Sequence, residues 1–499
     1  MIAHVHSATP WGVDALGVVV EVDIQGGLPS FSVVGLPDSC VKESRERVRS
    51  AIVNSGLDFP PRRITVNLAP ADVRKEGGTF DLPVAVAILT ALGHAPGDTV
   101  ARHLFVGELG LDGSVRPVRG VLSAALLARR KGFAAIVCPF PNAYEARLAR
   151  IDVYPATTLT DVLAFLRGER ACAGTSHTPP ARQESGPRPD LLEVNGQAFG
   201  KRGLEIAAAG GHNLLFVGPP GAGKSMLARR LPSILPALSE EEILVCTAVY
   251  SAAGLLGKDE IVAERPFRSP HHTISDAGLV GGGSIPTPGE VSLAHKGVLF
   301  LDEMPEFRRS ALEALRQPLE DQTVRISRAN ATVSFPADFQ LLAAMNPCPC
   351  GYLGHPDRQC SCTPTQVARY RARVSGPLLD RIDMHLWIEA VPAEGVFSRS
   401  EGPSSQRVRS HVEAAREVQK SRGFINARIP PDRMEGVCRL DGSTRSLLVA
   451  AVKRMSLSMR AVSRVIKVAR TIADLDGSGA ILENHVAEAL QFRPEGTAS

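Results

Sequence analysis

A glycine-rich segment near the middle of the chain carries the residue types that hold phosphate groups. Residues 218–225 read GPPGAGKS, with the apolar stretch HNLLFVG leading into them and SMLARRL following. Glycines allow backbone N–H groups to wrap phosphate oxygens, while a lysine and a hydroxyl at this spacing reach the terminal phosphates and Mg²⁺. The alternative, a chance match in a glycine-rich turn, is disfavoured by the expected strand before the loop and helix after it. The sequence therefore predicts that ATP contacts Gly218, Pro219, Pro220, Gly221, Ala222, Gly223, Lys224, Ser225 and Met226, with the Ser225 hydroxyl on Mg²⁺.

Two adjacent carboxylates follow a second apolar segment and suit the hydrolysis of a phosphate bond. Residues 297–303 read GVLFLDE. A buried strand here would deliver Asp302 to the Mg²⁺ and leave Glu303 to polarise the attacking water. Asn346 follows a third apolar segment, QLLAAM, where its side chain could orient that water. Taken alone, the acids could be surface charge and Asn346 a turn cap.

Two arginines are candidates for completing such a site. Arg381 lies in SGPLLDRID, and hydrolysis by phosphate-loop motors gains most from a cation that reaches the γ-phosphate, commonly from a neighbouring subunit. Arg460 lies in LSMRAVSR, where it shares one helical face with Arg464 and Lys467. That face could meet bound nucleotide or DNA phosphate. The alternatives are a surface ion pair for Arg381 and a solvated face for the basic stripe.

Four of the nine cysteines form one cluster in the sequence. Cys348 and Cys350 are separated by nine residues from Cys360 and Cys362. Four thiolates on two short turns suit tetrahedral Zn²⁺, although Cys-x-Cys is tighter than the usual spacing. The alternative is a loop with free cysteines.

Length and composition indicate what kind of protein holds these residues in place. A chain of 499 residues exceeds one hydrophobic core. Lys and Arg number 56 against 52 Asp and Glu, so a nucleic-acid partner would have to meet a local basic surface. The start of the chain resembles no secretory signal, which favours reduced thiols in the cytosol. The longest apolar runs, such as residues 82–92, fall short of the roughly 20 residues of a membrane span.

Composition also divides the chain into blocks. Residues 171–190 have a Pro-, Gly- and Ser-rich linker composition, and a weaker break covers 391–406. The predicted domains are 1–170, 191–395 after the linker 171–190, and 396–499. The first mixes strands with helices, the second alternates short strands and helices as a parallel phosphate-loop sheet would, and the third is helical. The expected strands are 17–23, 63–67, 134–138, 213–217, 298–301 and 340–344; the expected helices are 38–54, 82–92, 121–131, 408–420 and segments within 444–475.

Several long stretches carry a family resemblance over nearly the whole chain. They include FSVVGLPDSCVKESRERVRSAI, RITVNLAPADVRKEGGTFDLPVA, AAAGGHNLLFVGPPGAGKSMLA, RPFRSPHHTISDAGLVGGGSIPTPGEVSLAHKGVLFLDE, AAMNPCPCGY and ARTIADLDG. The chain resembles the magnesium-chelatase-like AAA+ ATPases of the ComM (YifB) group. The resemblance implies an α/β AAA+ P-loop core, a Lon-protease-like α+β domain before it and a helical lid after it. It also implies a bacterial cytoplasmic ATPase, a hexameric ring, and branch migration of DNA during natural transformation.

The resemblance implies the same nucleotide site as the residues do. It supports Lys224, Ser225, Asp302, Glu303 and Asn346 at the nucleotide, with Arg381 as the finger and Arg460 as the lid arginine. The group is also similar to the minichromosome-maintenance helicases in having a hairpin before the Asn-bearing strand.

Residues 323–335, TVRISRANATVSF, are the corresponding hairpin here. Two β-branched runs flank a polar turn, and we expect the tip to project Arg325 and Arg328 toward a ring pore. Two arginines bind phosphates without reading base sequence, which suits a motor that steps along any DNA. An ordinary surface hairpin is the alternative.

Two further segments bear on function. Residues 107–133 resemble the proteolytic domain of Lon-type proteases, but Thr79 and Ser123-Ala124 stand where a Ser nucleophile and a Lys base are needed, so we expect a DNA- or partner-contacting domain. Residues 265–284 lack periodicity and are expected to form a long loop at the pore or substrate, and His271 and His272 are not expected to bind metal.

Three functions therefore stay open. A ring-shaped DNA motor leads, because of the hairpin and the N-terminal domain. A motor for metal insertion into a tetrapyrrole is second, since chelatases have the same core. An ATP-dependent Lon-like protease is third, and the lack of a Ser-Lys pair disfavours it.

Overall fold

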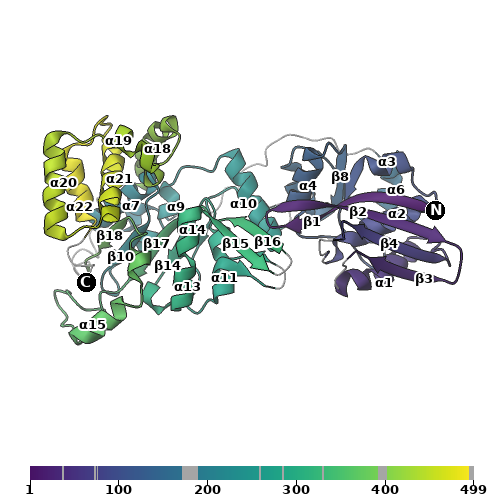
Figure 1. Cartoon of the computed structure of the whole chain (residues 1–499), viewed down its shortest axis with the longest axis horizontal. Coiled ribbons are helices and arrows are strands. Elements are labelled where there is room, and N and C mark those ends of the chain that lie inside the picture. Colours follow the sequence, from purple (N-terminus) through teal and green to yellow (C-terminus); the bar gives the residue numbers. More distant parts are fainter. Residues whose placement is uncertain are drawn as a thin grey trace.

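The computed structural model describes residues 1–35, 39–71, 75, 77–170, 189–257, 260–283, 286–328, 331–390 and 402–493. The molecule is elongated, with an N-terminal α/β domain at one end, the phosphate-loop core in the middle and a helical bundle at the other end (Figure 1). Most of the expected linker, 171–188, lies outside the described residues.

The N-terminal domain is built on a seven-stranded sheet in the order β3-β4-β2-β1-β5-β8-β9. In β2, Val18, Val20, Val22 and Ile24 are all buried, and this period of two places one face of the strand on the core. The strands are β1 (Ile2–Trp11), β2 (Asp14–Gln25), β3 (Ser30–Val34), β4 (Arg63–Ala69), β5 (His103–Phe105), β8 (Ala135–Pro139) and β9 (Asp152–Ala156), with β6 (Glu108–Leu109) and β7 (Val115–Arg116) paired separately.

Helices cover this sheet. The helix α2 (Asp81–Ala91) is apolar on all sides, since it packs against α1 (Ser39–Asn54) as well as β1 and β2. The remaining helices of the domain are α3 (Gly97–Ala101), α4 (Val121–Arg130), α5 (Ala143–Arg147) and α6 (Leu159–Leu166).

The central domain contains a five-stranded parallel sheet in the order β11-β14-β17-β10-β18. Its inner strands are buried throughout, as expected for a parallel sheet with both faces covered. Because β17 lies between β10 and β14, the carboxyl ends of these three strands meet at one edge. The strands are β10 (Leu214–Val217), β11 (Phe267–Arg268), β14 (Val298–Leu301), β17 (Gln340–Met345) and β18 (Met384–Trp387).

Short helices and two hairpins surround this sheet. The helices are α7 (Ala198–Gly210), α8 (Lys224–Ala228), α9 (Leu231–Ile234), α10 (Glu240–Ala253), α11 (Asp276–Val280), α12 (Glu290–Leu293), α13 (Arg309–Ala314), α14 (Arg316–Asp321), α15 (Pro364–Arg371) and α16 (Gly376–Leu379). The hairpins are β12 (Gly281–Gly282) with β13 (Thr287–Pro288), and β15 (Thr323–Arg328) with β16 (Ala331–Pro336).

The C-terminal helices form a lid that shares one hydrophobic core with the central domain. Val465, Val468 and Ile472 belong to the same buried cluster as Leu214 and Phe216 of β10. The lid therefore packs as part of the core, on the side of α7. Its helices are α18 (Ser405–Arg422), α19 (Met434–Val437), α20 (Gly442–Met455), α21 (Met459–Leu475) and α22 (Glu483–Gln491).

The N-terminal domain contacts the core at α10 and at β16. Helix α4 packs on α10, and the backbone N–H of Gly120 donates to the Ser251 carbonyl at 3.3 Å. The β1–β2 turn lies on β16, where a Cβ atom on Gly12 would come within 2.7 Å of the Ser334 carbonyl oxygen. Gly12 also has φ +67°, so two constraints favour glycine there.

The expected strands and helices overlap observed elements, with boundaries that differ by one or a few residues, but the expected long loop was wrong. Residues 265–284 contain β11, α11 and β12 and are not one long loop. The Ser275 hydroxyl caps α11 by accepting from the Gly278 N–H at 3.1 Å. A five-residue helix and two-residue strands are too short to produce a visible periodicity.

A half-buried ion cluster joins the lid to the core sheet. Asp338, just before β17, accepts from Lys296 Nζ at 2.8 Å and pairs with Arg428 of the lid. Burial by itself would raise the pKa of Asp338, but Arg428 and Lys296 lower it to about 2. The carboxylate therefore stabilises the folded state wherever it is ionised.

We expect Asp338→Asn to lower the free energy of unfolding at pH 7 by on the order of 2 kcal/mol, because the variant loses this ion pair. The pKa falls from 3.8 to about 2 on folding, so in wild type the contribution is complete above about pH 5 and is lost as the pH falls through 3.8 toward 2. Urea titrations at several pH values, followed by the fluorescence of Trp11 and Trp387, measure both the loss of stability and its pH dependence. Asp432→Asn, on the lid surface beside Arg433, is the control, and equal stability of Asp338→Asn and wild type at pH 7 would contradict the assignment.

Candidate nucleotide-binding site

The phosphate loop connects β10 to α8. Gly221 and Gly223 have φ values of +79° and +88°, a region in which side chains are strained. Gly218 has a different constraint, since a Cβ atom there would lie 2.1 Å from the Ile388 carbonyl oxygen. These glycines allow the loop to turn tightly at the end of the strand.

Lys224 is buried and points back into this loop. Its Nζ donates to the carbonyls of Gly218 at 2.6 Å and Pro219 at 2.8 Å, and to Asn346 Oδ1 at 3.1 Å. Burial lowers the pKa of Lys224, and the nearby charges of Asp302 and Glu303 oppose that shift. The ammonium is thus surrounded by acceptors that phosphate oxygens could replace.

Ser225 and Asp302 meet across the end of β17. The Ser225 hydroxyl donates to Asp302 Oδ2 at 2.6 Å. The other carboxylate oxygen accepts from the Glu303 N–H at 3.0 Å, and Glu303 turns away from the strand with φ +50°. A hydroxyl and a carboxylate are oxygen donors of the kind Mg²⁺ prefers, so this pair fits the expected ion.

Tyr370 is a neighbour of the site that the sequence did not single out. It is buried on the otherwise polar helix α15, and the backbone N–H of Asn346 donates to its hydroxyl. Burial raises the pKa of Tyr370 to about 12, so the phenol stays neutral and fixes the backbone of Asn346. The sequence feature that could have indicated this role is a single aromatic residue in an otherwise polar helix.

Arg381 does not reach the site of its own chain. It donates to the Pro377 carbonyl at 2.5 Å and pairs with Glu320. Among the described residues, no hydrogen bond or ion pair joins it to Lys224 or to the acid pair.

The predicted basic stripe on α21 is divided. Arg460 is exposed at the start of the helix. Arg464 instead pairs with Asp383 at 3.1 Å, and Lys467 donates to the Ala427 carbonyl at 3.1 Å. The three residues therefore form neither a continuous phosphate-facing stripe nor a fully solvated face, because Arg464 and Lys467 bind groups of the same chain, and Arg460 alone stays exposed.

The hairpin β15–β16 carries an exposed arginine on one strand. Val324 and Ile326 face the core while Arg325 is exposed, and Arg325 lies opposite Ser334. Arg325 is therefore in mid-strand, three residue pairs before the last pair of the ladder, Arg328 with Ala331, so its expected place at the tip was wrong. The side chain of Arg328 lies outside the described residues.

The remaining predicted residues fall as follows. Met226, after Ser225, is exposed. The sulfur atoms of Cys348, Cys350, Cys360 and Cys362 gather within 4.8 Å of one another. The rings of His271 and His272 are 4.1 Å apart at their centroids and tilted by 34°.

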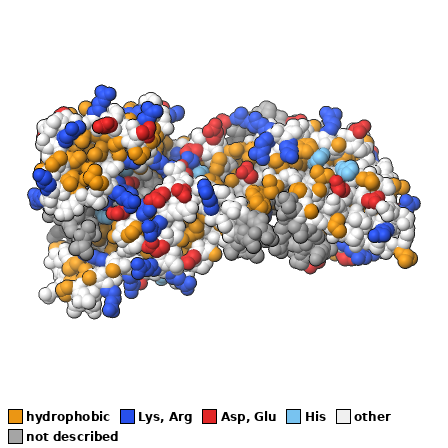
Figure 2. All heavy atoms as spheres, viewed as in Figure 1, with side chains coloured by type: hydrophobic (Ala, Val, Ile, Leu, Met, Phe, Trp, Pro, Cys, Tyr) orange, Lys and Arg blue, Asp and Glu red, His pale blue; other side chains and the backbone are white. Residues whose placement is uncertain are grey.

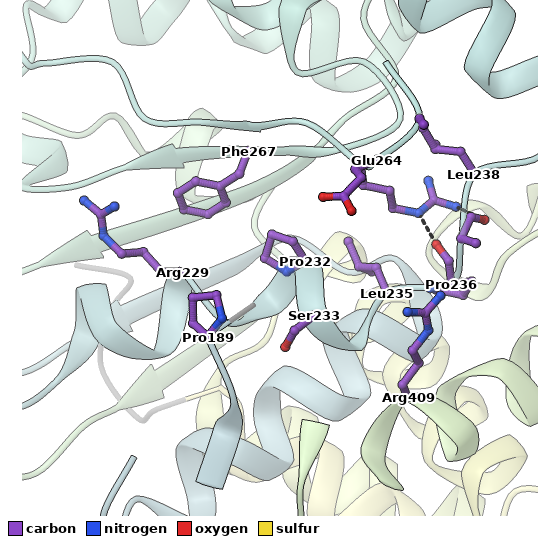
Figure 3. A pocket seen from close by; sticks show the side chains of 13 residues that line it. Pro189, Arg229, Pro232, Ser233, Leu235, Pro236, Leu238, Glu264, Phe267 and Arg409 are labelled. Carbon is purple, nitrogen blue, oxygen red and sulfur yellow. Dashed lines mark hydrogen bonds between the residues drawn. The ribbon is translucent and has the colours of Figure 1, made fainter. Parts of the chain in front are cut away.

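A separate pocket of about 420 Å³ is lined by residues that include Arg229, Pro232 and Phe267. Figure 3 shows Phe267, Pro232, Leu235 and Arg409 around it, with the Arg265 Nε donating to the Pro236 carbonyl. No predicted nucleotide contact lines this pocket.

The sheet order, the phosphate loop and the acid pair define the central domain as an AAA+ P-loop core, and α18–α22 as its helical lid. Family comparison adds three matches. "Magnesium chelatase, subunit ChlI" covers residues 190–396, "Subunit ChlI of Mg-chelatase" covers 20–142, and "Magnesium chelatase, subunit ChlI C-terminal" covers 402–493.

Two of the similar proteins cover nearly the whole chain, and a third covers about a third of it. YifB of Salmonella typhimurium is 46% identical over 498 residues, covering 99% of this chain and 97% of its own. "Competence protein ComM" of Haemophilus influenzae is 45% identical over 499 residues, with the same coverage. "Lon protease 2" of Bacillus subtilis is 28% identical over 204 residues, 35% of this chain and 36% of its own. The chain belongs to the ComM/YifB family of magnesium-chelatase-like AAA+ ATPases.

We expect Glu303→Gln to bind ATP as wild type does and to turn it over at least about 100-fold more slowly, because the amide cannot polarise water. Binding of a fluorescent nucleotide and release of phosphate measure the two effects. Glu306→Gln is the matched control, since Glu306 lies three residues on and pairs with Arg373 at the surface at 2.8 Å. Normal hydrolysis by Glu303→Gln would refute the role of this residue.

Proposed function

We propose that this protein is an ATP-hydrolysing DNA motor, a hexameric branch-migration helicase that acts on recombination intermediates during natural transformation. The observation that carries the proposal is the conjunction of the Ser225–Asp302 pair with an arginine-bearing hairpin on the same core. The printed name of the relative from Haemophilus influenzae, a competence protein, supports the setting. The proposal includes a cytoplasmic location, which the resemblance to the family implies. None of the described helices is long and apolar enough to cross a membrane.

The nucleotide part of the proposal assigns one role to each residue. Residues 218–226 wrap the phosphates, and Lys224 neutralises the terminal ones. Ser225 and Asp302 would hold Mg²⁺, which supplies charge stabilisation for phosphoryl transfer when bound. Glu303 takes the proton of the attacking water. The Asn346 side chain, whose amide oxygen accepts from Lys224 and whose backbone is held by Tyr370, orients that water.

Ring assembly is supported by the nucleotide site of the single chain, which Arg381 of the same chain does not reach. Arg381 serves a neighbouring subunit, after release from Glu320, and Arg460 reads the nucleotide from the lid. The lid also exposes large apolar side chains at Val449, Met459 and Leu482, and Figure 2 shows hydrophobic side chains gathered over these helices. Exposed apolar surface of this kind is typical of protein contacts.

DNA binding is assigned to the outer face of the hairpin. Arg325, Ser327, Thr332 and Ser334 are exposed, while the alternate residues are buried in the core. Basic and acidic side chains are interspersed over the surface in Figure 2, so attraction of DNA depends on such local groups. Arg328 is included in this surface by its position in the sequence. Arginine, hydroxyls and backbone bind phosphates without sequence preference.

Two alternatives have less support. A metal-insertion motor is favoured by the family name alone. A Lon-like protease is disfavoured because Ser123 is buried, with its hydroxyl donating to the Val13 carbonyl at 2.5 Å, and Thr79 is buried as well. In this arrangement Ser123 fixes the turn that contacts the hairpin.

The test measures ATP turnover and movement of a synthetic four-way DNA junction side by side. We expect junction DNA to stimulate turnover and ATP to drive migration. Arg325→Ala should lower the stimulation at least about fivefold and reduce the salt dependence of DNA binding by about one unit of slope, because one phosphate contact is lost. Arg407→Ala, which removes an exposed charge on α18, is the control. Turnover without stimulation or migration would contradict the helicase assignment.

A further inference from the structure

The four cysteine sulfur atoms have the arrangement of a metal tetrahedron. Cys348 Sγ lies 3.4 Å from Cys350 Sγ and 3.7 Å from Cys360 Sγ, and the latter two are 3.5 Å apart. With all four sulfurs within 4.8 Å of one another, there is room for one ion at their centre. A Zn–S bond of about 2.3 Å in a tetrahedral site gives sulfur pairs about 3.8 Å apart. The observed spacing is therefore close to that of a bound tetrathiolate.

Other arrangements of four cysteines fit these distances less well. A disulfide brings two sulfurs to about 2.05 Å, and these four cysteines are free. An iron–sulfur cluster spreads its four thiolates around several iron atoms, which the compact set of sulfurs does not allow.

The groups around the sulfurs also suit a charged metal site. The Cys350 N–H points to Cys362 Sγ and the Cys362 N–H points to Cys360 Sγ, both at 3.4 Å. Such N–H groups stabilise thiolates and orient them toward a metal. Cys348 is buried while the other three are partly exposed, so an ion can enter from solvent.

We propose that Cys348, Cys350, Cys360 and Cys362 bind one structural Zn²⁺ per chain. The segment they hold runs from Asn346 to α15 and has no helix or strand among its described residues. A long irregular segment of this kind has no ladder to keep it in place, and a metal supplies the missing constraint.

The position of the site gives the metal a second consequence, which rests on the proposed ATPase function. Cys348 lies two residues after Asn346, the group that holds Lys224. A Cβ atom on Gly351 would lie 2.6 Å from Pro220 Cδ, so the turn between the cysteine pairs packs directly on the phosphate loop. Loss of the metal would release the Asn346–Lys224 hydrogen bond and the packing of Gly351 on Pro220. Zn²⁺ thereby positions the nucleotide site without contacting the nucleotide.

The first experiment is metal analysis of the full chain purified under reducing conditions. We expect about one zinc per chain, and X-ray absorption showing four sulfur ligands at about 2.3 Å. Cys350→Ser with Cys362→Ser should lose the zinc. Cys138→Ala, a buried cysteine in β8 of the N-terminal domain, should keep it. Wild-type protein that holds no zinc and takes up none when it is added would overturn the proposal, as would bound iron.

A second readout separates the metal from the motor. Zinc removal by a chelator should slow ATP turnover at least about tenfold, equivalent to ~1.4 kcal/mol in the barrier, and zinc restoration should recover it. Glu303→Gln should lose turnover and keep its zinc. Failure of the ATPase assignment would leave the zinc content unchanged, whereas unchanged turnover in zinc-free protein would overturn the positioning role.

Discussion

The contact between Ser225 and Asp302 is the interaction on which the rest of the structure depends. The two residues follow strands that are not neighbours, and β17 lies between these strands. The hydroxyl and the carboxylate can meet because the three parallel strands end within two residues of the same level, with Val217 opposite Met345 and Leu301 opposite Ala343. Ligands of open α/β sheets bind at this kind of edge. Asn346 follows the middle strand, β17, and this position places its side-chain oxygen 3.1 Å from Lys224 Nζ.

Packing behind this edge keeps it rigid. Tyr370 holds the backbone of Asn346 from one side, and Gly351 brings the cysteine-bearing turn against Pro220 of the phosphate loop. Farther away, Asp338 joins the opposite end of β17 to the lid. The N-terminal domain reaches the hairpin through Gly12. The cysteine-bearing turn, the lid and the N-terminal domain thus each contact an element connected to the central sheet. Because these contacts are close-packed, a displacement of any of these parts would shift the strand ends that carry the nucleotide site.

Local patterns in the sequence predicted most of the fold and the centre of the site. The phosphate loop, the acid pair and the apolar strands are contiguous segments whose periodicity or spacing is visible in one dimension. What the sequence could not show are pairings between distant segments. Arg464 meets Asp383 and Lys467 meets the Ala427 carbonyl, so a helical face that looked like a surface is partly internal. Tyr370 and Gly351 acquire their roles only through contacts with residues more than 20 positions away.

The central claim is that Ser225 and Asp302 form the Mg²⁺ side of an ATP site, and calorimetric titration tests it directly. A non-hydrolysable ATP analogue is titrated with and without Mg²⁺ into wild type and Asp302→Asn. We predict that Mg²⁺ strengthens binding to wild type at least about tenfold, or ~1.4 kcal/mol, and that this gain is absent from the variant. An equal gain in both proteins would contradict the account.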